Sequence, residues 1–442
     1  MQFHSNPVPE HEEVPLADDG LWEETVEYWT ERGSPDEATN LAFVLSVSTD
    51  PDPHVQFAQL AEILSLTEAQ GSEIVGQECY YLSKPRPRTL IGPGKAREIA
   101  DRARDLGATL LVVDAELSPS QARNLEDVAG IPVSDREGVI LNVFVRQART
   151  RRSRVQVEIA QLEYLRPRIR GVGLNMDQQI GGVPGGRGPG ETASELLARK
   201  LDGRLLELKK VERRLGRSDE NRRRGRADCR RIALLGYTNA GKTSLMNALT
   251  DEQLSARDRP FETLDTTSRS LTRHGGTVLL SDTVGFIRRL PERLLASFES
   301  TLSEVRDASL LAIVVDLSDF EWQHHLDITL SMIERLGAAE VPRFYIFNKL
   351  DLVDQVPPLD HYLPHRLVSS QALGDLKEAL LAEVRRDQPV TELLIPYTAT
   401  EAMDIAHGQC RVIESEARQQ GLWLRLEAKP AVLARLRSLL CI

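Results

Sequence analysis

Short apolar runs alternate with amphipathic segments from about residue 41, and this alternation predicts an α/β chain. The apolar runs at 41–47, 73–82 and 109–113 have the length of buried strands. Apolar positions recur at helical spacing over 56–69, 95–106 and 118–129. Strands that alternate with helices are typical of a largely parallel sheet. We therefore predict an N-terminal α/β domain over residues 41–145. Gly92-Pro93-Gly94-Lys95 could be mistaken for a phosphate-binding loop, but we interpret it as the first turn of a helix.

Two longer apolar stripes follow, each with the period of an α-helix. The first contains Val155, Ile159, Leu162 and Leu165, and the second contains Leu197, Leu201, Leu205, Leu208 and Leu215. Each stripe needs a partner, so the simplest arrangement is a long antiparallel helical hairpin over residues 146–216. The loop between the helices, roughly 171–190, is rich in glycine and contains Arg187. A flexible linker is one interpretation, and the arginines nearby favour contact with RNA.

The apolar run 232–235 leads directly into Gly236-Tyr237-Thr238-Asn239-Ala240-Gly241-Lys242-Thr243. A buried strand, a glycine-rich turn and a helix are the setting of a phosphate-binding loop. Its backbone N–H groups would converge on phosphate oxygens at the positive end of the helix. Lys242 would neutralise the β- and γ-phosphates, and the Thr243 hydroxyl would bind Mg²⁺.

A second strand, 277–281, leads into Asp282-Thr283-Val284-Gly285. Asp282 would support the metal through its waters, and the Gly285 N–H would lie near the γ-phosphate. Asn348-Lys349-Leu350-Asp351 follows a third strand, 344–347. The Asp351 carboxylate can accept two hydrogen bonds from guanine, whereas adenine would leave it unpaired at a cost of about 1–3 kcal/mol. The Lys349 stem can lie along the base. The order of these motifs predicts guanine nucleotide binding, as GTP or GDP.

Two loops complete the predicted site. Within 261–269, a threonine should approach Mg²⁺ only when the γ-phosphate is present; we assign Thr263, with Thr266 and Thr267 as rivals. The neighbouring positions predicted to contact nucleotide are Phe261, Glu262, Leu264 and Asp265. After Leu367-Val368, a second loop would offer backbone groups to guanine O6 from Ser369, Ser370 and Gln371. We assign the catalytic roles to Lys242, Thr243, Thr263 and Gly285, and the metal contacts to Thr243 and Thr263.

Composition indicates a globular protein of several domains. The chain has 442 residues, 41% hydrophobic and 27% charged, and we expect no membrane span and no signal peptide. The four cysteines lack the spacing of a zinc site and are typical of a cytoplasmic protein. The net charge of −11 is unevenly spread. Residues 1–40 carry eleven Asp and Glu against Arg32 alone, whereas residues 146–231 carry 23 Lys and Arg against 11 Asp and Glu. An acidic chain with such a basic segment can bind RNA locally.

These patterns divide the chain into six parts. We predict an acidic flexible extension (1–40), the N-terminal α/β domain (41–145), the basic hairpin (146–216), an Arg-rich linker (217–230), a GTPase domain with a phosphate-binding loop (231–387) and a small α+β domain (388–442). In the last part we expect a strand at 391–397, a helix from Ala402 to Gln419, a strand at 422–426 and a helix at 431–440. His407 there is expected to be a surface or packing residue.

Several motifs resemble those of the HflX family of translational GTPases over roughly residues 40–442. They include the phosphate-binding loop, Phe261-Glu-Thr-Leu-Asp265, Asp282-Thr-Val-Gly-Phe-Ile287, Leu117 to Leu125, Gln156 to Leu162 and Gly186 to Thr192. The resemblance implies a cytoplasmic GTPase that binds the large ribosomal subunit and acts in the splitting or rescue of stalled ribosomes. It also implies a glycine-rich loop directed at the peptidyl transferase centre. We expect a monomer away from the ribosome.

Phe286 occupies the position where many GTPases carry a glutamine that orients the attacking water. Its side chain can neither donate nor accept a hydrogen bond, so we predict slow intrinsic hydrolysis that a partner accelerates. Two other functions remain open on sequence grounds. One is a GTPase of ribosome assembly or RNA maturation, and the other is an RNA-binding adaptor in which hydrolysis is incidental.

Overall fold

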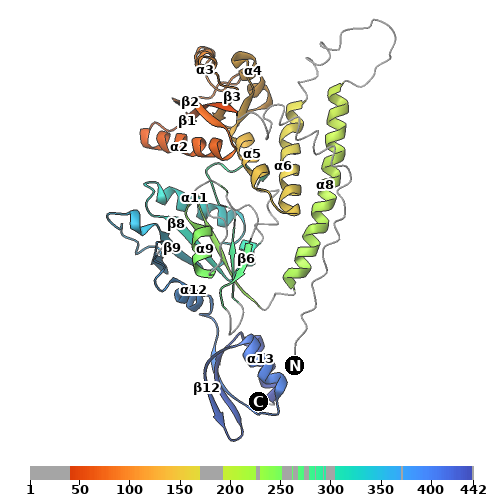
Figure 1. Cartoon of the computed structure of the whole chain (residues 1–442), viewed down its shortest axis with the longest axis vertical. Helices are drawn as coiled ribbons and strands as arrows, with labels where there is room; N and C mark the ends of the chain where they lie inside the picture. The colour runs from red at the N-terminus through yellow and green to blue at the C-terminus, as the bar shows by residue number, and fades with distance from the viewer. Residues whose placement is uncertain are drawn as a thin grey trace. The chain divides into compact units, whose positions relative to one another are not determined.

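The structure is a computed structural model. The described residues are 40–169, 193–224, 229–250, 261, 267–272, 278–283, 285–291, 293–294, 304–369 and 372–440. They form two compact units that divide after Arg136: the described residues of 40–136 and those of 137–440. Both units are built on parallel sheets with helices, so the predicted multidomain α/β class is confirmed (Figure 1).

The first unit contains a four-stranded parallel sheet. Its strands are β1 (Leu41–Ser48), β2 (Glu73–Tyr81), β3 (Leu110–Asp114) and β4 (Val133–Asp135), in the order β2-β1-β3-β4. Helices α2 (Pro53–Ala69), α3 (Pro93–Asp105) and α4 (Pro119–Ala129) connect them. Every residue of β3 is buried, as expected for a strand with both faces covered. The predicted alternation of strands and helices is therefore observed.

Helix ends in this unit follow from local sequence. Ser118 and Gln121 form a capping box at the start of α4, which satisfies two backbone N–H groups that the helix cannot pair itself. Helix α3 begins at Pro93 with Gly92 as its N-cap. Lys95, in its first turn, forms ion pairs with Glu78 at 2.5 Å and Glu98 at 2.7 Å. The glycine-rich stretch before it is thus a helix start, and its lysine is held by carboxylates.

The second unit begins with a group of helices. Helix α5 (Arg136–Gln147) leads to α6 (Arg151–Ile169), and α6 packs alongside α8 (Ala193–Arg224) (Figure 1). Three ion pairs join α6 to α8: Glu158 with Arg204 at 2.8 Å, Glu163 with Lys209 at 2.7 Å, and Arg166 with Asp202 at 2.5 Å. Helix α8 continues to Arg224, so the first half of the segment predicted as a linker is helical. The glycine-rich loop lies outside the described residues.

The central sheet has six strands in the order β10-β9-β8-β5-β7-β6. The strands are β5 (Arg230–Gly236), β6 (Thr267–Ser270), β7 (Val278–Asp282), β8 (Leu310–Asp316), β9 (Arg343–Asn348) and β10 (His365–Leu367). Only β6 is antiparallel to its neighbour among these pairings. Helices α9 (Lys242–Thr250), α11 (Trp322–Arg335) and α12 (Leu376–Val384) accompany it. The carboxyl ends of β5, β7, β8 and β9 lie at one edge of the sheet, where ligands of open α/β sheets bind.

The C-terminal part is an antiparallel sheet with two helices, and it corrects one prediction. Strands β11 (Val390–Ile395), β12 (Arg411–Arg418) and β13 (Gly421–Glu427) pair in the order β11-β13-β12. Helix α13 spans Thr400–Gln409, and α14 spans Pro430–Leu440. The predicted single helix from Ala402 to Gln419 is therefore wrong, because its second half is β12. Alanine, glutamate and arginine there favour a helix locally, and pairing with β13 overrides that preference. His407 lies in α13 and is exposed, as expected.

Candidate nucleotide site

The phosphate-binding loop connects β5 to α9 at the centre of the six-stranded sheet. Strand β5 has β7 on one side and β8 on the other, so the loop lies where the strand order reverses. Gly241 has φ +92°, and a Cβ on it would lie 2.3 Å from Nδ2 of Asn348. Both features exclude ordinary side chains at this position. The loop therefore has the shape predicted from its glycines.

Lys242 is buried at the start of α9. Its ammonium donates to the carbonyl oxygens of Gly236 at 3.1 Å and of Tyr237 at 2.8 Å. Burial lowers the pKa of Lys242 to about 8, against the opposing effect of the Asp282 carboxylate. Two of the three N–H donors of the ammonium are thus bonded to the loop itself, and these bonds fix the position of the positive charge. A phosphate anion next to it would favour the protonated form again.

Thr243 and Asp282 meet across the site. The Thr243 hydroxyl donates to Oδ2 of Asp282 at 2.7 Å, and Asp282, at the end of β7, is fully buried. Thr283 follows and donates its hydroxyl to the carbonyl of Leu234 at 2.7 Å. Two hard oxygen donors side by side have the chemistry that Mg²⁺ prefers. These residues therefore fit a divalent cation beside the loop.

The asparagine of Asn348-Lys349-Leu350-Asp351 joins the base side of the site to the phosphate side. Asn348, at the end of β9, is buried, and its Nδ2 donates to the carbonyl of Ala240 at 2.9 Å. Its Oδ1 is buried without a hydrogen-bond partner in the described part of the chain. Buried polar atoms are nearly always paired, so this oxygen is available to a ligand or to a backbone group beside it.

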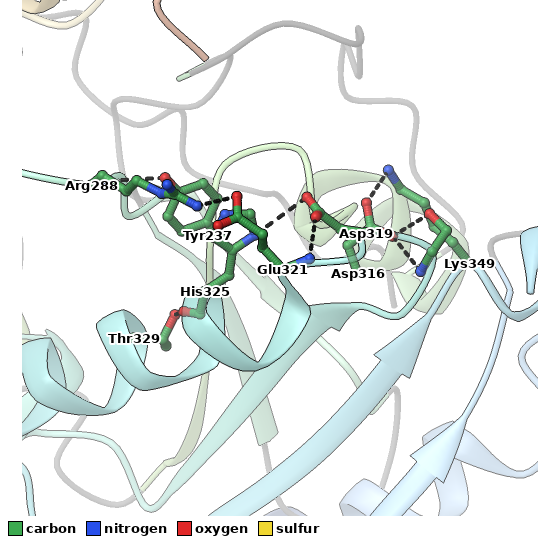
Figure 2. Close-up of polar contacts among 9 residues, drawn as sticks. Tyr237, Arg288, Asp316, Asp319, Glu321, His325, Thr329 and Lys349 are labelled. Atoms are coloured by element: carbon green, nitrogen blue, oxygen red, sulfur yellow. Dashed lines mark hydrogen bonds and ion pairs between the residues drawn. The ribbon is translucent and has the colours of Figure 1, made fainter. Parts of the chain in front are cut away.

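Lys349 and Asp351 follow β9 in a short exposed turn. Lys349 has φ +60°, and its ammonium pairs with Oδ2 of Asp316 at 2.6 Å. That pair fixes the end of a side chain whose stem was predicted to lie along the base (Figure 2). Asp351 lies in a single 3₁₀ turn, Leu350–Leu352, and its side chain is exposed. Its carboxylate is thus accessible to an incoming base.

Only part of the two predicted loops is described. Phe261 is buried with φ +58°, and its ring meets that of Phe144 from α5 edge to face, with centroids 4.6 Å apart. Ser369 is buried and bonded to Ala372. The remaining predicted loop residues lie outside the described part: Glu262, Thr263, Leu264, Asp265, the rival Thr266, Val284, Ser370 and Gln371. Thr267, the other rival, belongs to β6.

A cluster beside the loop was not predicted from the sequence (Figure 2). The Tyr237 ring stacks on the imidazole of His325 in α11, with centroids 3.8 Å apart and planes at 9°. The Tyr237 hydroxyl accepts a hydrogen bond from the N–H of Arg288 at 2.9 Å. The Arg288 guanidinium forms a buried ion pair with Glu321. These four residues come from three segments that are far apart in sequence, so no motif could reveal them.

Comparisons with known proteins agree with this geometry. Residues 58–145, 147–226 and 231–349 match family models described as GTP-binding GTPase N-terminal, GTP-binding GTPase Middle Region and 50S ribosome-binding GTPase. The GTPase HflX of Spirochaeta thermophila is 40% identical over 355 residues, which are 78% of this chain and 86% of that protein. The chain belongs to the HflX family. The GTPase HflX of Escherichia coli is 38% identical over 317 residues, 69% of this chain and 74% of that one.

Membership of the HflX family confirms the resemblance seen in the motifs and makes the chain a GTP hydrolase that binds GTP and GDP. Among solved structures, a GTP-binding protein from Sulfolobus solfataricus in complex with GDP is similar, at 20% identity and a TM-score of 0.43. The similarity covers 78% of this chain and 98% of that one. No helix in the described part of the chain has the length and apolar character needed to cross a membrane.

Proposed function

We propose that the GTP-bound form of this HflX-family protein binds the large ribosomal subunit, and that hydrolysis to GDP releases it. In this role it would act in the splitting or rescue of stalled ribosomes. The observation that carries the proposal is the match of residues 231–349 to a family model described as a 50S ribosome-binding GTPase. That segment contains the phosphate-binding loop, so nucleotide state and ribosome binding would involve the same domain.

The helical pair supports an RNA partner. Arg204 and Lys209 form ion pairs with carboxylates of α6, so their charges are neutralised within the protein. Lys210, Arg213 and Arg214, further along α8, are exposed. Exposed cations along one helix can neutralise several phosphates of structured RNA. The cations of α8 named here therefore divide into charges paired within the protein and charges exposed to solvent.

The site residues would share the work on the triphosphate. Lys242 would hold the β- and γ-phosphates, the backbone amides of 236–243 would surround them, and the Gly285 N–H would contact the γ-phosphate alone. Thr243 would hold Mg²⁺ directly, with Asp282 behind it and Thr263 as the second proposed protein ligand. When bound, the metal would neutralise charge that develops on the phosphate oxygens. Asp351 would select guanine.

Hydrolysis by the protein alone would be slow. Phe286 is 1% exposed, and its hydrocarbon ring cannot orient a water molecule for attack on the γ-phosphorus. The N–H of Phe286 donates to the carbonyl of Gly236, and its carbonyl accepts from Thr238. With its backbone bonded to the loop and its ring buried, Phe286 leaves water positioning to another group. A ribosome that orders the neighbouring loops would supply it.

Co-sedimentation with purified mature large subunits tests the proposal. We expect the protein to pellet with the subunits in a non-hydrolysable GTP analogue and to stay in the supernatant in GDP. Lys242→Ala is a control that should lose this difference between nucleotides. The double variant Lys210→Glu/Arg214→Glu should bind weakly in both, while Arg435→Glu/Arg437→Glu, at exposed positions of α14, serves as its charge-matched control. Equal pelleting in both nucleotides would refute the switch, and capture of immature particles alone would favour a role in assembly.

A further inference from the structure

Tyr237 connects the phosphate-binding loop to helix α11. Its backbone carbonyl accepts a hydrogen bond from the Lys242 ammonium at 2.8 Å, while its ring stacks on His325 (Figure 2). Tyr237 is 8% exposed, and stacking of aromatic rings can stabilise a structure beyond the area that it buries. His325 is itself close to a carboxylate, since its Nδ1 lies 3.4 Å from Oδ2 of Asp319. The residue that orients the catalytic ammonium is thus also fixed by α11.

Arg288 fixes the segment that follows Gly285. Its backbone N–H donates to the Tyr237 hydroxyl at 2.9 Å, and its guanidinium pairs with Glu321, just before α11. The side chains of Arg288 and Glu321 are 8% and 10% exposed. The Glu321 N–H in turn donates to Oδ1 of Asp319 at 2.8 Å. Separating the two side chains of a buried ion pair would leave each charge uncompensated. The pair therefore holds Arg288 next to Glu321.

Gly285 lies between these anchors and the phosphate-binding loop. On its C-terminal side, Phe286 exchanges two backbone hydrogen bonds with the loop, at 3.1 Å to Gly236 and 2.8 Å from Thr238. A Cβ on Gly285 would lie 3.0 Å from Nζ of Lys242 and 2.9 Å from Cγ2 of Thr238. Residues 285–288 are therefore held by main-chain bonds to the loop at one end and by the side chains of Tyr237 and Glu321 at the other.

We propose that Tyr237 and Arg288, held by His325 and Glu321, are positioning residues that set the Gly285 N–H for the γ-phosphate. Their side chains would act through the backbone of 285–288 and not by contact with base or phosphate. Their effect is to keep 285–288 in one place before GTP arrives, so that binding does not have to order it. Since GDP has no γ-phosphate, the Tyr237 hydroxyl and the Arg288–Glu321 pair act more on the affinity for GTP than on that for GDP. Through the same contacts, a movement of α11 would change the position of the Gly285 N–H at the γ-phosphate.

The discriminating test compares affinities for a non-hydrolysable GTP analogue and for GDP, measured by calorimetry on the full-length protein without ribosomes. Tyr237→Phe keeps the ring on His325 and removes the acceptor of the buried Arg288 N–H. We expect affinity for the analogue to fall about tenfold, the factor that corresponds to about 1.4 kcal/mol, and affinity for GDP to change less than about twofold. Glu321→Gln should act in the same direction.

Two variants of the same domain serve as matched controls. Tyr362→Phe removes another tyrosine hydroxyl near α11, and Asp375→Asn removes the carboxylate of an exposed pair with Arg366. Both should leave the two affinities unchanged. The positioning role is refuted if Tyr237→Phe and Glu321→Gln lower the affinity for GDP as much as that for the analogue. It is also refuted if they lower neither affinity. Thermal unfolding of each variant separates loss of the fold from loss of discrimination. Because no ribosome is present, the outcome is independent of the proposed ribosomal role.

Discussion

Gly241→Ala is the sharpest single perturbation of the phosphate-binding loop. The new Cβ would lie 2.3 Å from Nδ2 of Asn348, at a residue with φ +92°. A side chain at such a backbone angle costs about 1–3 kcal/mol. Moving the Asn348 amide would also break its bond to the Ala240 carbonyl, worth about 0.5–1.5 kcal/mol. Together these favour a different loop shape by about 1.5–4.5 kcal/mol, so GDP affinity should fall roughly 12- to 1,600-fold.

Gly337→Ala is the matched control for this prediction. Gly337 also has a left-handed backbone, with φ +71°, but its nearest neighbour would be Cδ of Arg306 at 4.0 Å. It carries the backbone strain without the clash and lies after α11, away from the loop. Titration of each purified variant with a fluorescent GDP gives the affinities, and thermal unfolding reports the fold. If Gly241→Ala binds GDP within about threefold of the wild type, the close contact with Asn348 does not shape the site.

Three further predictions test other parts of the site and fold. Asp351→Asn should weaken GTP binding and improve binding of xanthosine triphosphate; an unchanged base preference in competition assays would overturn the assignment of that carboxylate. The protein alone should hydrolyse GTP well below about ten per second, and large subunits should raise the rate; fast turnover without them would contradict the argument from Phe286. Burial raises the pKa of Glu158, against the influence of Arg204. Between its unfolded and folded pKa values the folded state binds more protons, so stability conferred by this group falls as pH rises through that window and is level above it. Hydrogen exchange of α6 and α8 amides should show that slope, and Glu158→Gln should lack it.

The phosphate-binding loop and the strands around it were predictable because their signals are contiguous. A buried strand, a glycine turn and a helix lie within residues 230–250, and each choice of residue has a local reason. The alternation in the first unit was predictable for the same reason, since β1 and β3 are short apolar runs with both faces covered. In both cases the pattern that specifies an element lies within the element.

The features that were missed depend on contacts distant in sequence. Strand β12 contains residues that favour a helix, and it is extended because it pairs with β13. Gly421, at the start of β13, lies so close to Ile395 that a Cβ would meet its carbonyl oxygen at 2.3 Å, a constraint invisible before the strands are paired. The stack of Tyr237 on His325 and the pair of Arg288 with Glu321 likewise join segments about 90 and 33 residues apart. Local propensity carries no information about such partners.

The arrangement of the sheet explains which parts of the site are rigid. Asp282 ends β7 and Asn348 ends β9, and each bonds to a residue of the phosphate-binding loop or of α9. Strands in one sheet hold these groups in fixed register, so the phosphate and base sides are set together. Residues 285–288 have left the sheet, and their position depends on Tyr237 and on the start of α11. Beside the loop of Thr263, a signal that depends on the γ-phosphate can therefore pass through this segment, which the sheet does not hold and which Glu321, just before α11, restrains.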